Sequence, residues 1–264
     1  MKIRPAKQQP PSVPRTRAQR QPRKAKTPRP KRIVRDNDQL YRLFCSYVNE
    51  NDSTGENRMG PHGVQRLLND LGYECNDRRV LVLAYKFDAK TPCEFSLNEW
   101  NDGMEYLEAT SVQALQRSID AINYEMNTNR ELFCEIYQFT FDYTKSPILK
   151  KMDLATAINC WDALFGVRTK VLDNWINFLK AEEQAAADKL RSEKGDAYAE
   201  GVKYCIDGDT WDLFLDFYLD STPDLLDYDK NDAWPVLIDK FVEYCRENLG
   251  YPKPIGDEEK EYYY

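Results

Sequence analysis

The chain has 264 residues, of which 42% are hydrophobic and 12% aromatic, so it can bury a substantial core in one large domain or two small ones. It contains no run near the roughly 20 consecutive apolar residues that cross a bilayer. Its N-terminus also lacks the apolar segment of a signal peptide. We therefore expect a soluble intracellular protein with no membrane partner.

The net charge of −7 hides a strong asymmetry along the chain. Residues 1–35 contain thirteen Lys or Arg, seven Pro and no acidic residue, so the rest of the chain carries −20. Such a basic, Pro-rich segment buries too little apolar surface to offset its ordering entropy, and we predict a disordered tail. Its clusters Arg23–Lys26 and Arg29–Arg32 suit nuclear import, non-specific phosphate binding or a solubilising role. We expect a nuclear and cytoplasmic protein.

Residue types that carry enzymatic chemistry are sparse. The only histidine, His62, stands between Pro61 and Gly63 and is predicted to be a surface turn residue. The chain has no P-loop, no GxGxxG and no HExxH, so we predict neither catalytic residues nor a cofactor. Seven cysteines without a CxxC pair predict buried, reduced thiols and no zinc site. They are Cys45, Cys75, Cys93, Cys134, Cys160, Cys205 and Cys245.

Helical patterns follow one another from about residue 36 to 251. Apolar residues at Leu40, Leu43, Phe44, Tyr47 and Val48 share one helical face, and similar stripes recur downstream. Aromatic residues on several faces of 132–143 predict a central helix, and the last helix is expected to start near 234–235. We predict an all-α fold, with residues 252–264 as an acidic tail. The expected helix caps are Ser96, Asp153, Thr169 and Asp209.

Two stretches lie between these helical patterns. The charged, Ala-rich stretch Glu182–Gly201 is expected to be a solvent-facing helical extension or a mobile loop. The stretch Asp88–Glu99 has the twelve-residue length of an EF-hand loop. Lys90 and Pro92 stand where that loop needs oxygen ligands, so we predict an EF-hand-like geometry without calcium.

Six segments, in order, resemble the PONY (potentiating-neddylation) domain of the defective-in-cullin-neddylation family. The resemblance covers roughly residues 36–251. The longest segment reads Asn-Asp-Ala-Trp-Pro-Val-Leu-Ile-Asp-Lys-Phe-Val-Glu-Tyr from residue 231, preceded by Asp-Tyr-Asp from residue 227. The others are 84–87 (Ala-Tyr-Lys-Phe), 93–96 (Cys-Glu-Phe-Ser), 100–104 (Trp-Asn-Asp-Gly-Met), 137–141 (Tyr-Gln-Phe-Thr-Phe) and 209–217 (Asp-Thr-Trp-Asp-Leu-Phe-Leu-Asp-Phe).

The resemblance implies a non-catalytic scaffold with an EF-hand-like first half and a second helical half, packed as one unit. It implies a monomer that binds the winged-helix end of a cullin C-terminal domain and the N-terminally acetylated conjugating enzyme. The chemistry would belong to that enzyme and to a cullin-bound RING protein, while the scaffold supplies proximity. The ubiquitin-associated domain of some family members is absent from residues 1–35.

Two groups of site residues follow from the resemblance. The cullin-binding residues would be Asp209, Ala233 and Asp239; without the resemblance, they are a helix cap, a small residue at a helix entrance and a solvated charge. The second group would form a pocket for the acetylated methionine; without the resemblance, its members are ordinary core residues. They are Val64, Val80, Leu83, Ala84, Cys93, Phe95, Tyr143 and Ala163. Cys160 and Ala163 stand where the family has bulkier residues and Pro61 stands where it has isoleucine, which predicts an altered shape of this pocket.

Two other classes of function stay open from the sequence. A helical adaptor could bind nucleic acid through its basic tail, in which case deletion of residues 1–35 would abolish salt-dependent binding. A calcium-responsive adaptor would release or absorb heat in a calcium titration.

Overall fold

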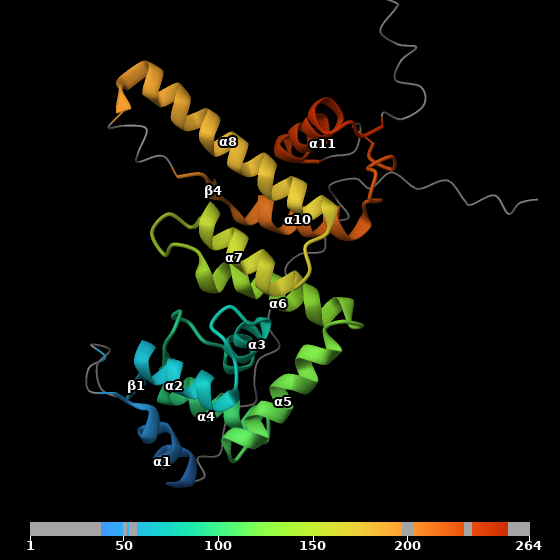
Figure 1. Ribbon diagram of the computed structural model, residues 1–264. Helices are drawn as coiled ribbons and strands as arrows, with labels where there is room; N and C mark the ends of the chain where they lie inside the picture. The colour runs from blue at the N-terminus through green and yellow to red at the C-terminus, as the bar shows by residue number, and fades with distance from the viewer. Residues whose placement is uncertain (1–37, 50–51, 53–56, 197–202, 230–233, 253–264) are drawn as a thin grey trace, which may run out of the picture. The chain divides into compact units, whose positions relative to one another are not determined.

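The computed structural model describes residues 38–49, 52, 57–196, 203–229 and 234–252 (Figure 1). These residues form helices and four two-residue strands, which confirms the predicted all-α class. They fall into two compact units, one ending at Asp220 and one beginning at Ser221, so a unit boundary lies inside the predicted 36–251 domain. In the described part of the chain, no helix is long and apolar enough to cross a membrane. The predicted tail 1–35 and residues 253–264 lie outside the described ranges.

The elements of the first unit follow the predicted helical pattern closely (Figure 1). Its first half contains α1 (Asp38–Tyr47), β1 (Arg58–Met59), α2 (Pro61–Leu71), α3 (Arg78–Phe87), β2 (Phe95–Ser96), α4 (Leu97–Tyr106) and α5 (Val112–Glu125). Its second half contains α6 (Arg130–Thr144), β3 (Met152–Asp153), α7 (Leu154–Phe165), α8 (Lys170–Lys194), β4 (Cys205–Ile206) and α10 (Gly208–Asp220). The second unit contains α11 (Val236–Asn248).

The first half has the predicted EF-hand-like arrangement, in which two helix–loop–helix pairs meet through a short antiparallel ladder. Strand β1 pairs with β2, with Met59 opposite Phe95. Trp100 is fully buried and its indole nitrogen donates a hydrogen bond to the carbonyl of Leu40 at 3.1 Å, which ties α4 to α1. Phe87 packs edge-on against Trp100, with ring centroids 5.8 Å apart. These contacts build one aromatic core beneath the ladder.

The acidic side chains Asp88 and Glu99, at the two ends of the loop between α3 and α4, interact with other groups of the same loop. The Lys90 ammonium lies 2.8 Å from a carboxylate oxygen of Asp88. One carboxylate oxygen of Glu99 accepts the Lys90 backbone N–H at 2.9 Å, and the other accepts from Ser96 in the predicted capping box. In the described ranges, no group of three or more His, Cys, Asp or Glu side chains is placed to hold a metal ion.

Helix α6 is the central helix of the second half, as its aromatic residues predict. Tyr137 is fully buried; its hydroxyl donates to the Trp211 carbonyl at 3.0 Å and accepts from the Trp161 indole N–H at 2.9 Å. The Trp211 indole N–H in turn donates to the Tyr137 carbonyl at 3.0 Å. The rings of Tyr137 and Trp211 are stacked with centroids 4.4 Å apart. Helices α6, α7 and α10 are therefore joined through groups that satisfy one another's polar atoms.

Three predicted caps are confirmed, and one is wrong. Ser96, Asp153 and Thr169 each accept a backbone N–H at the start of their helix. Helix α10 instead begins at Gly208, and the Thr210 N–H donates to Asp207 at 2.8 Å. The sequence has an aspartate at both 207 and 209. A capping carboxylate stands just before its helix and accepts an N–H about three residues later, and Asp207 meets this condition whereas Asp209 does not. Asp209 is thus inside the helix.

Two other expectations need correction or completion. All seven cysteines are free, but only Cys160 and Cys245 are buried, because Cys45, Cys75 and Cys93 lie on solvent-facing sides of their segments. The stretch from Glu182 continues α8 as an exposed helix as far as Lys194, while residues 197–202 lie outside the described ranges. The helical alternative is therefore confirmed for the part of this stretch that the structure describes.

Gly103 provides a test of the first-half core. A Cβ atom at Gly103 would lie 2.2 Å from the ring of the fully buried Phe87. Alanine normally stabilises a helix interior relative to glycine, but here overpacking opposes it. We expect Gly103→Ala to lower the free energy of unfolding by about 1–3 kcal/mol in urea titrations. Asn98→Ala, on the exposed side of the same helix, is the control and should change it by less than about 0.5 kcal/mol. A stabilised Gly103→Ala protein would contradict the close packing.

Candidate functional site

The two aspartates expected to bind a partner both lie in the first turn of a helix. Asp209 is exposed in α10, and Asp239 is half-buried in α11. The unpaired N–H groups of a helix start give this end a partial positive charge, which favours carboxylates there. The two residues belong to different compact units, and Ala233 lies outside the described ranges.

The side chain of Asp239 is held within its own unit. One of its carboxylate oxygens accepts a hydrogen bond from the Tyr228 hydroxyl. Tyr228 is 8% exposed, and the Arg246 guanidinium lies 5.7 Å from its ring centroid. The carboxylate is thus anchored on one side by a buried phenol.

Half of the predicted pocket residues are core residues of the first half. Val64 lies in α2, Leu83 and Ala84 lie in α3, and Phe95 lies in β2, and all four are buried. Phe95 packs against Phe87 with ring centroids 5.2 Å apart. Their apolar character is therefore explained by packing within this half alone.

The structure brings together Cys93 and Tyr143, two predicted pocket residues that lie fifty positions apart in the sequence. The Cys93 backbone N–H donates to the Tyr143 hydroxyl at 3.3 Å, and Cys93 adopts a left-handed conformation with φ 59°. Burial raises the pKa of Tyr143 to about 12. The pKa of the Cys93 thiol is also raised, because neighbouring protein atoms partly desolvate the thiol although the residue as a whole is exposed. Both groups are therefore neutral at pH 7, which suits an uncharged ligand better than an ionic one.

A separate cleft of about 780 Å³ lies where α3 begins and where α5 and α7 end. Of the eight predicted pocket residues only Ala163 lines this cleft. Val80 directly follows the lining residue Arg79 in α3 and is half-buried. The cleft is polar, in contrast to the predicted methionine pocket. Its lining consists of Gly72, Glu74, Asn76, Asp77, Arg78, Arg79, Asn123, Asn127, Asn159, Asp162, Ala163, Phe165, Gly166 and Val167.

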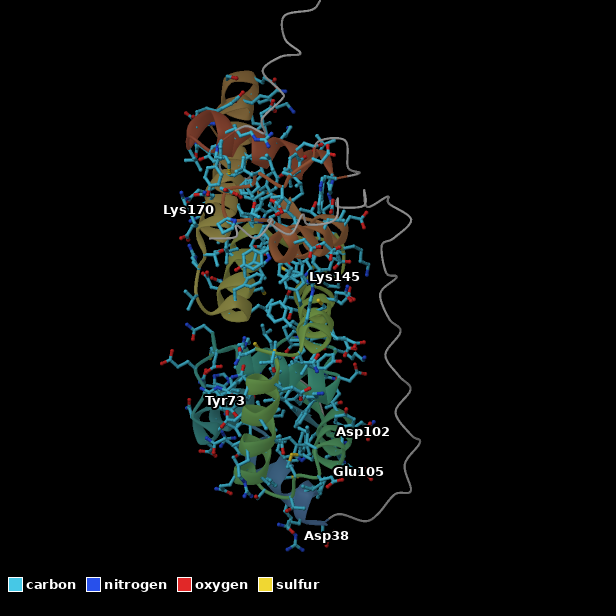
Figure 2. The ribbon with its side chains drawn as sticks, turned by 90° about the vertical axis from the view of Figure 1, so that its right-hand side faces the viewer. Asp38, Tyr73, Asp102, Glu105, Lys145 and Lys170 are labelled. Carbon is cyan, nitrogen blue, oxygen red and sulfur yellow. The ribbon has the colours of Figure 1, made fainter. Side chains whose placement is uncertain are left out.

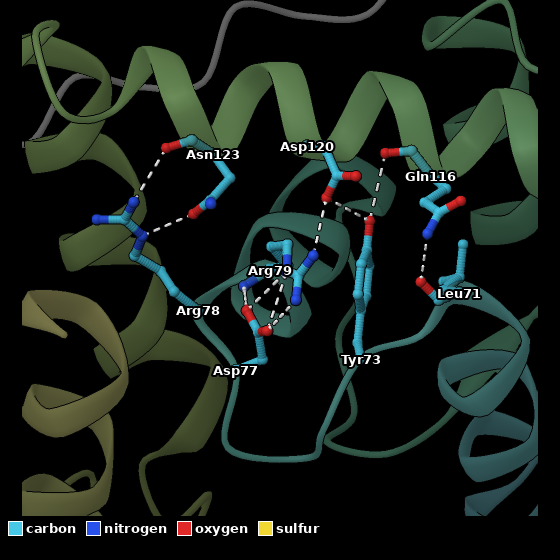
Figure 3. A network of polar contacts seen from close by, with 8 residues as sticks. All are labelled: Leu71, Tyr73, Asp77, Arg78, Arg79, Gln116, Asp120 and Asn123. Carbon is cyan, nitrogen blue, oxygen red and sulfur yellow. Dashed lines mark hydrogen bonds and ion pairs between the residues drawn. The ribbon is translucent and has the colours of Figure 1, made fainter.

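Arg78 joins the two halves of the first unit across this cleft. Its guanidinium donates to the Asn123 side chain at 2.7 Å and to the Asn123 carbonyl at 3.0 Å (Figure 3). It also donates to the Asn127 side chain at 3.0 Å and to the Leu164 carbonyl in α7 at 3.4 Å. Burial lowers the pKa of Arg78, and these neutral oxygens still accept from its charged form. One side chain therefore connects α3, α5 and α7.

A second network lies beside the first on α5. Asp77 caps α3 and pairs with Arg79, and Arg79 reaches Asp120 at 3.1 Å (Figure 3). Tyr73 donates to the same Asp120 at 3.1 Å and lies beneath the Arg79 guanidinium, 4.2 Å from ring centroid to Cζ. Burial favours a raised pKa of Asp77, but hydrogen bonds from Arg79 outweigh it and lower this pKa. The two networks fix the start of α3 relative to α5.

Sequence reasoning missed this polar cleft. The available signal was the run Asp77-Arg78-Arg79, a capping aspartate directly followed by two cations. Its partners on α5 and α7 lie between 41 and 86 residues away, so no local spacing reveals them. The hydrogen-bond partner of Asp239, Tyr228, lies eleven residues before it and outside α11, so helical periodicity did not reveal it either.

The chain is similar in sequence to known proteins over most of its length. A family profile described as "Cullin binding" matches residues 114–244. The chain is 55% identical over 220 residues to "Defective in cullin neddylation protein 1" of Caenorhabditis elegans, covering 83% of this chain and 75% of that protein. It is 28% identical to "DCN1-like protein 3" of Drosophila melanogaster and 31% identical to that of Homo sapiens, covering 59% and 61% of those proteins.

Arg78 allows a test of the connection between the halves. Arg78→Met keeps much of the side-chain length but leaves the oxygens of Asn123 and Asn127 without their donor. We expect a loss of about 1–3 kcal/mol in the free energy of unfolding, measured by urea denaturation. Arg117→Met, at an exposed arginine on α5 whose guanidinium donates to the Gln113 carbonyl of the same helix, should cost less than about 0.5 kcal/mol. Equal losses would show that the Arg78 contacts add no stability.

Asp77 gives a prediction about pH. Its lowered pKa means that the ionised carboxylate stabilises the folded state at pH values above the unfolded pKa, about 3.9. This contribution is lost as the pH falls through the folded pKa. We expect wild type to exceed Asp77→Asn in melting temperature at pH 7, with the gap shrinking below about pH 4. A gap that stays constant from pH 7 to pH 2 would contradict it.

Proposed function

Because this chain belongs to the defective-in-cullin-neddylation family, we propose that it promotes cullin neddylation as a scaffold. In this proposal the cullin C-terminal winged-helix region and the N-terminally acetylated conjugating enzyme bind to it together. The observation that carries the proposal is the 55% identity to a cullin-neddylation protein over most of both chains. The chain spans about three-fifths of the DCN1-like relatives from fly and human, so partners are proposed for this part of such proteins.

The charge distribution supports a basic cullin surface as the partner. Residues beyond the first 35 carry a net charge of −20, and charged rim groups of this kind steer association with a cationic partner. Asp209 is exposed in the first turn of α10, and Asp239 is half-buried beside Tyr228 in α11. We assign these two carboxylates, with Ala233, to cullin binding.

The second partner would be the acetylated N-terminus of the conjugating enzyme. An acetylated methionine carries no charge, and the neutral Cys93–Tyr143 pair includes a residue two positions before the buried Phe95 of the first half. We propose that Val64, Val80, Leu83, Ala84, Cys93, Phe95, Tyr143 and Ala163 take part in this contact. A cullin-bound RING protein would complete the assembly.

Such a scaffold needs no nucleophile of its own. Holding the thioester of the conjugating enzyme near the acceptor lysine turns an encounter between two proteins into a reaction within one complex. The proton transfers and the attack on the thioester then belong to the bound partners. The proposed contribution of this chain is the geometry of the complex.

The test is a neddylation assay with a cullin C-terminal domain, its RING protein and the acetylated conjugating enzyme. We expect wild type to accelerate transfer and Asp239→Lys or Asp209→Lys to reduce this acceleration by about tenfold or more, because each places a cation against a cationic partner. Asp102→Lys makes the same charge change at an exposed residue of α4 (Figure 2) and should retain the acceleration.

Circular dichroism should show that all three variants keep their helical content. If Asp209→Lys and Asp239→Lys both accelerate transfer as wild type does, the assignment of the cullin surface is wrong. If wild type itself gives no acceleration, the scaffold proposal fails.

A further inference from the structure

The hydrogen bond between Tyr228 and Asp239 gives this tyrosine a function beyond packing. We propose that Tyr228 is a positioning residue for cullin binding: its hydroxyl holds the Asp239 carboxylate in one orientation so that the second oxygen is presented to a cationic group of the partner. The inference rests on the proposed function, because it assigns to Tyr228 an effect on the same carboxylate.

The segment before α11 fixes the position of Tyr228. The carboxylate of Asp227 accepts the Thr222 N–H at 3.0 Å and the Thr222 hydroxyl at 2.6 Å, which closes the turn that precedes Tyr228. Leu225 in that turn is 1% exposed. A closed turn with a buried leucine restricts the backbone directly next to the tyrosine.

The ring of Tyr228 is held as well as its backbone. Its side chain is 8% exposed, and the Arg246 guanidinium from the later part of α11 lies 5.7 Å from the ring centroid. A cation over an aromatic face at this distance is attracted by the ring. The phenol is therefore fixed before any partner binds, and its hydroxyl donates from a fixed point.

Asp239 is the more exposed member of the pair. It stands in the first turn of α11 with a half-buried side chain, and one carboxylate oxygen accepts the Tyr228 hydrogen bond. Within the described part of the chain, the other oxygen accepts no hydrogen bond. The bond to Tyr228 thus removes rotamers that a partner would otherwise have to exclude, and binding costs less side-chain entropy.

The experiment measures affinity of the full chain for a cullin C-terminal domain by calorimetry, as a double-mutant cycle of Tyr228→Phe and Asp239→Ala. Tyr228→Phe removes only the hydroxyl. We expect it to weaken binding about three- to tenfold in the wild-type background and to have no effect in the Asp239→Ala background. Tyr124→Phe, at a tyrosine 76% exposed on α5, should leave the affinity unchanged.

The outcomes separate this inference from the proposed function. Equal weakening by Tyr228→Phe in both backgrounds means that the tyrosine acts only on folding, and it overturns the inference. Full affinity of Tyr228→Phe with weak binding by Asp239→Ala also overturns it but leaves the cullin surface intact. Full affinity of Asp239→Ala overturns both the surface assignment and the positioning role.

A second variant keeps the inference testable if Tyr228→Phe fails to fold. Asp239→Glu retains the charge but moves the carboxylate by one methylene group, away from the point at which Tyr228 donates. We expect it to lose affinity to a similar extent as Asp239→Ala. Wild-type affinity of Asp239→Glu would show that charge alone is sufficient, and the positioning role would be wrong.

Discussion

Tyr137, Trp161 and Trp211 join three helices of the first unit through hydrogen bonds and stacked rings. Three hydrogen bonds with donor–acceptor distances of 2.9–3.0 Å connect the three residues to one another, and all three side chains are fully buried. Loss of one partner would leave another buried polar group unsatisfied, so the set acts as a unit. Asp209 stands two residues before Trp211 in α10. The orientation of its helix is therefore set by α6 and α7.

The electrostatic surroundings of each proposed cullin-binding carboxylate are set by its own helix. Both proposed cullin-binding carboxylates lie at helix starts, where the helix favours negative charge. Asp207 supplies the cap of α10, so the proposed contact residue and the residue that secures the helix are different. The proposed binding and the stability of this helix can therefore change independently.

The first half shows how one fold accommodates different chemistry. Its helix pairs and its two-residue ladder have the EF-hand arrangement. The loop residues Asp88 and Glu99 instead receive an ammonium group and backbone N–H groups from the chain itself. The helix–loop–helix geometry therefore persists through hydrogen bonds supplied by the protein. The chemistry of this loop therefore follows from its residues and not from its fold.

The sequence alone determined the helix positions, three of the four expected caps and the family, because helical periodicity and capping depend on residues within a few positions of one another. Tertiary structure decided which aspartate caps α10, which cysteines reach solvent and what holds Asp239. Tertiary structure also determines where the polar cleft forms, since Arg78 donates hydrogen bonds to groups that lie 45 to 86 residues away in the sequence. Such partners are chosen by how helices pack, and no local spacing in the chain encodes that choice.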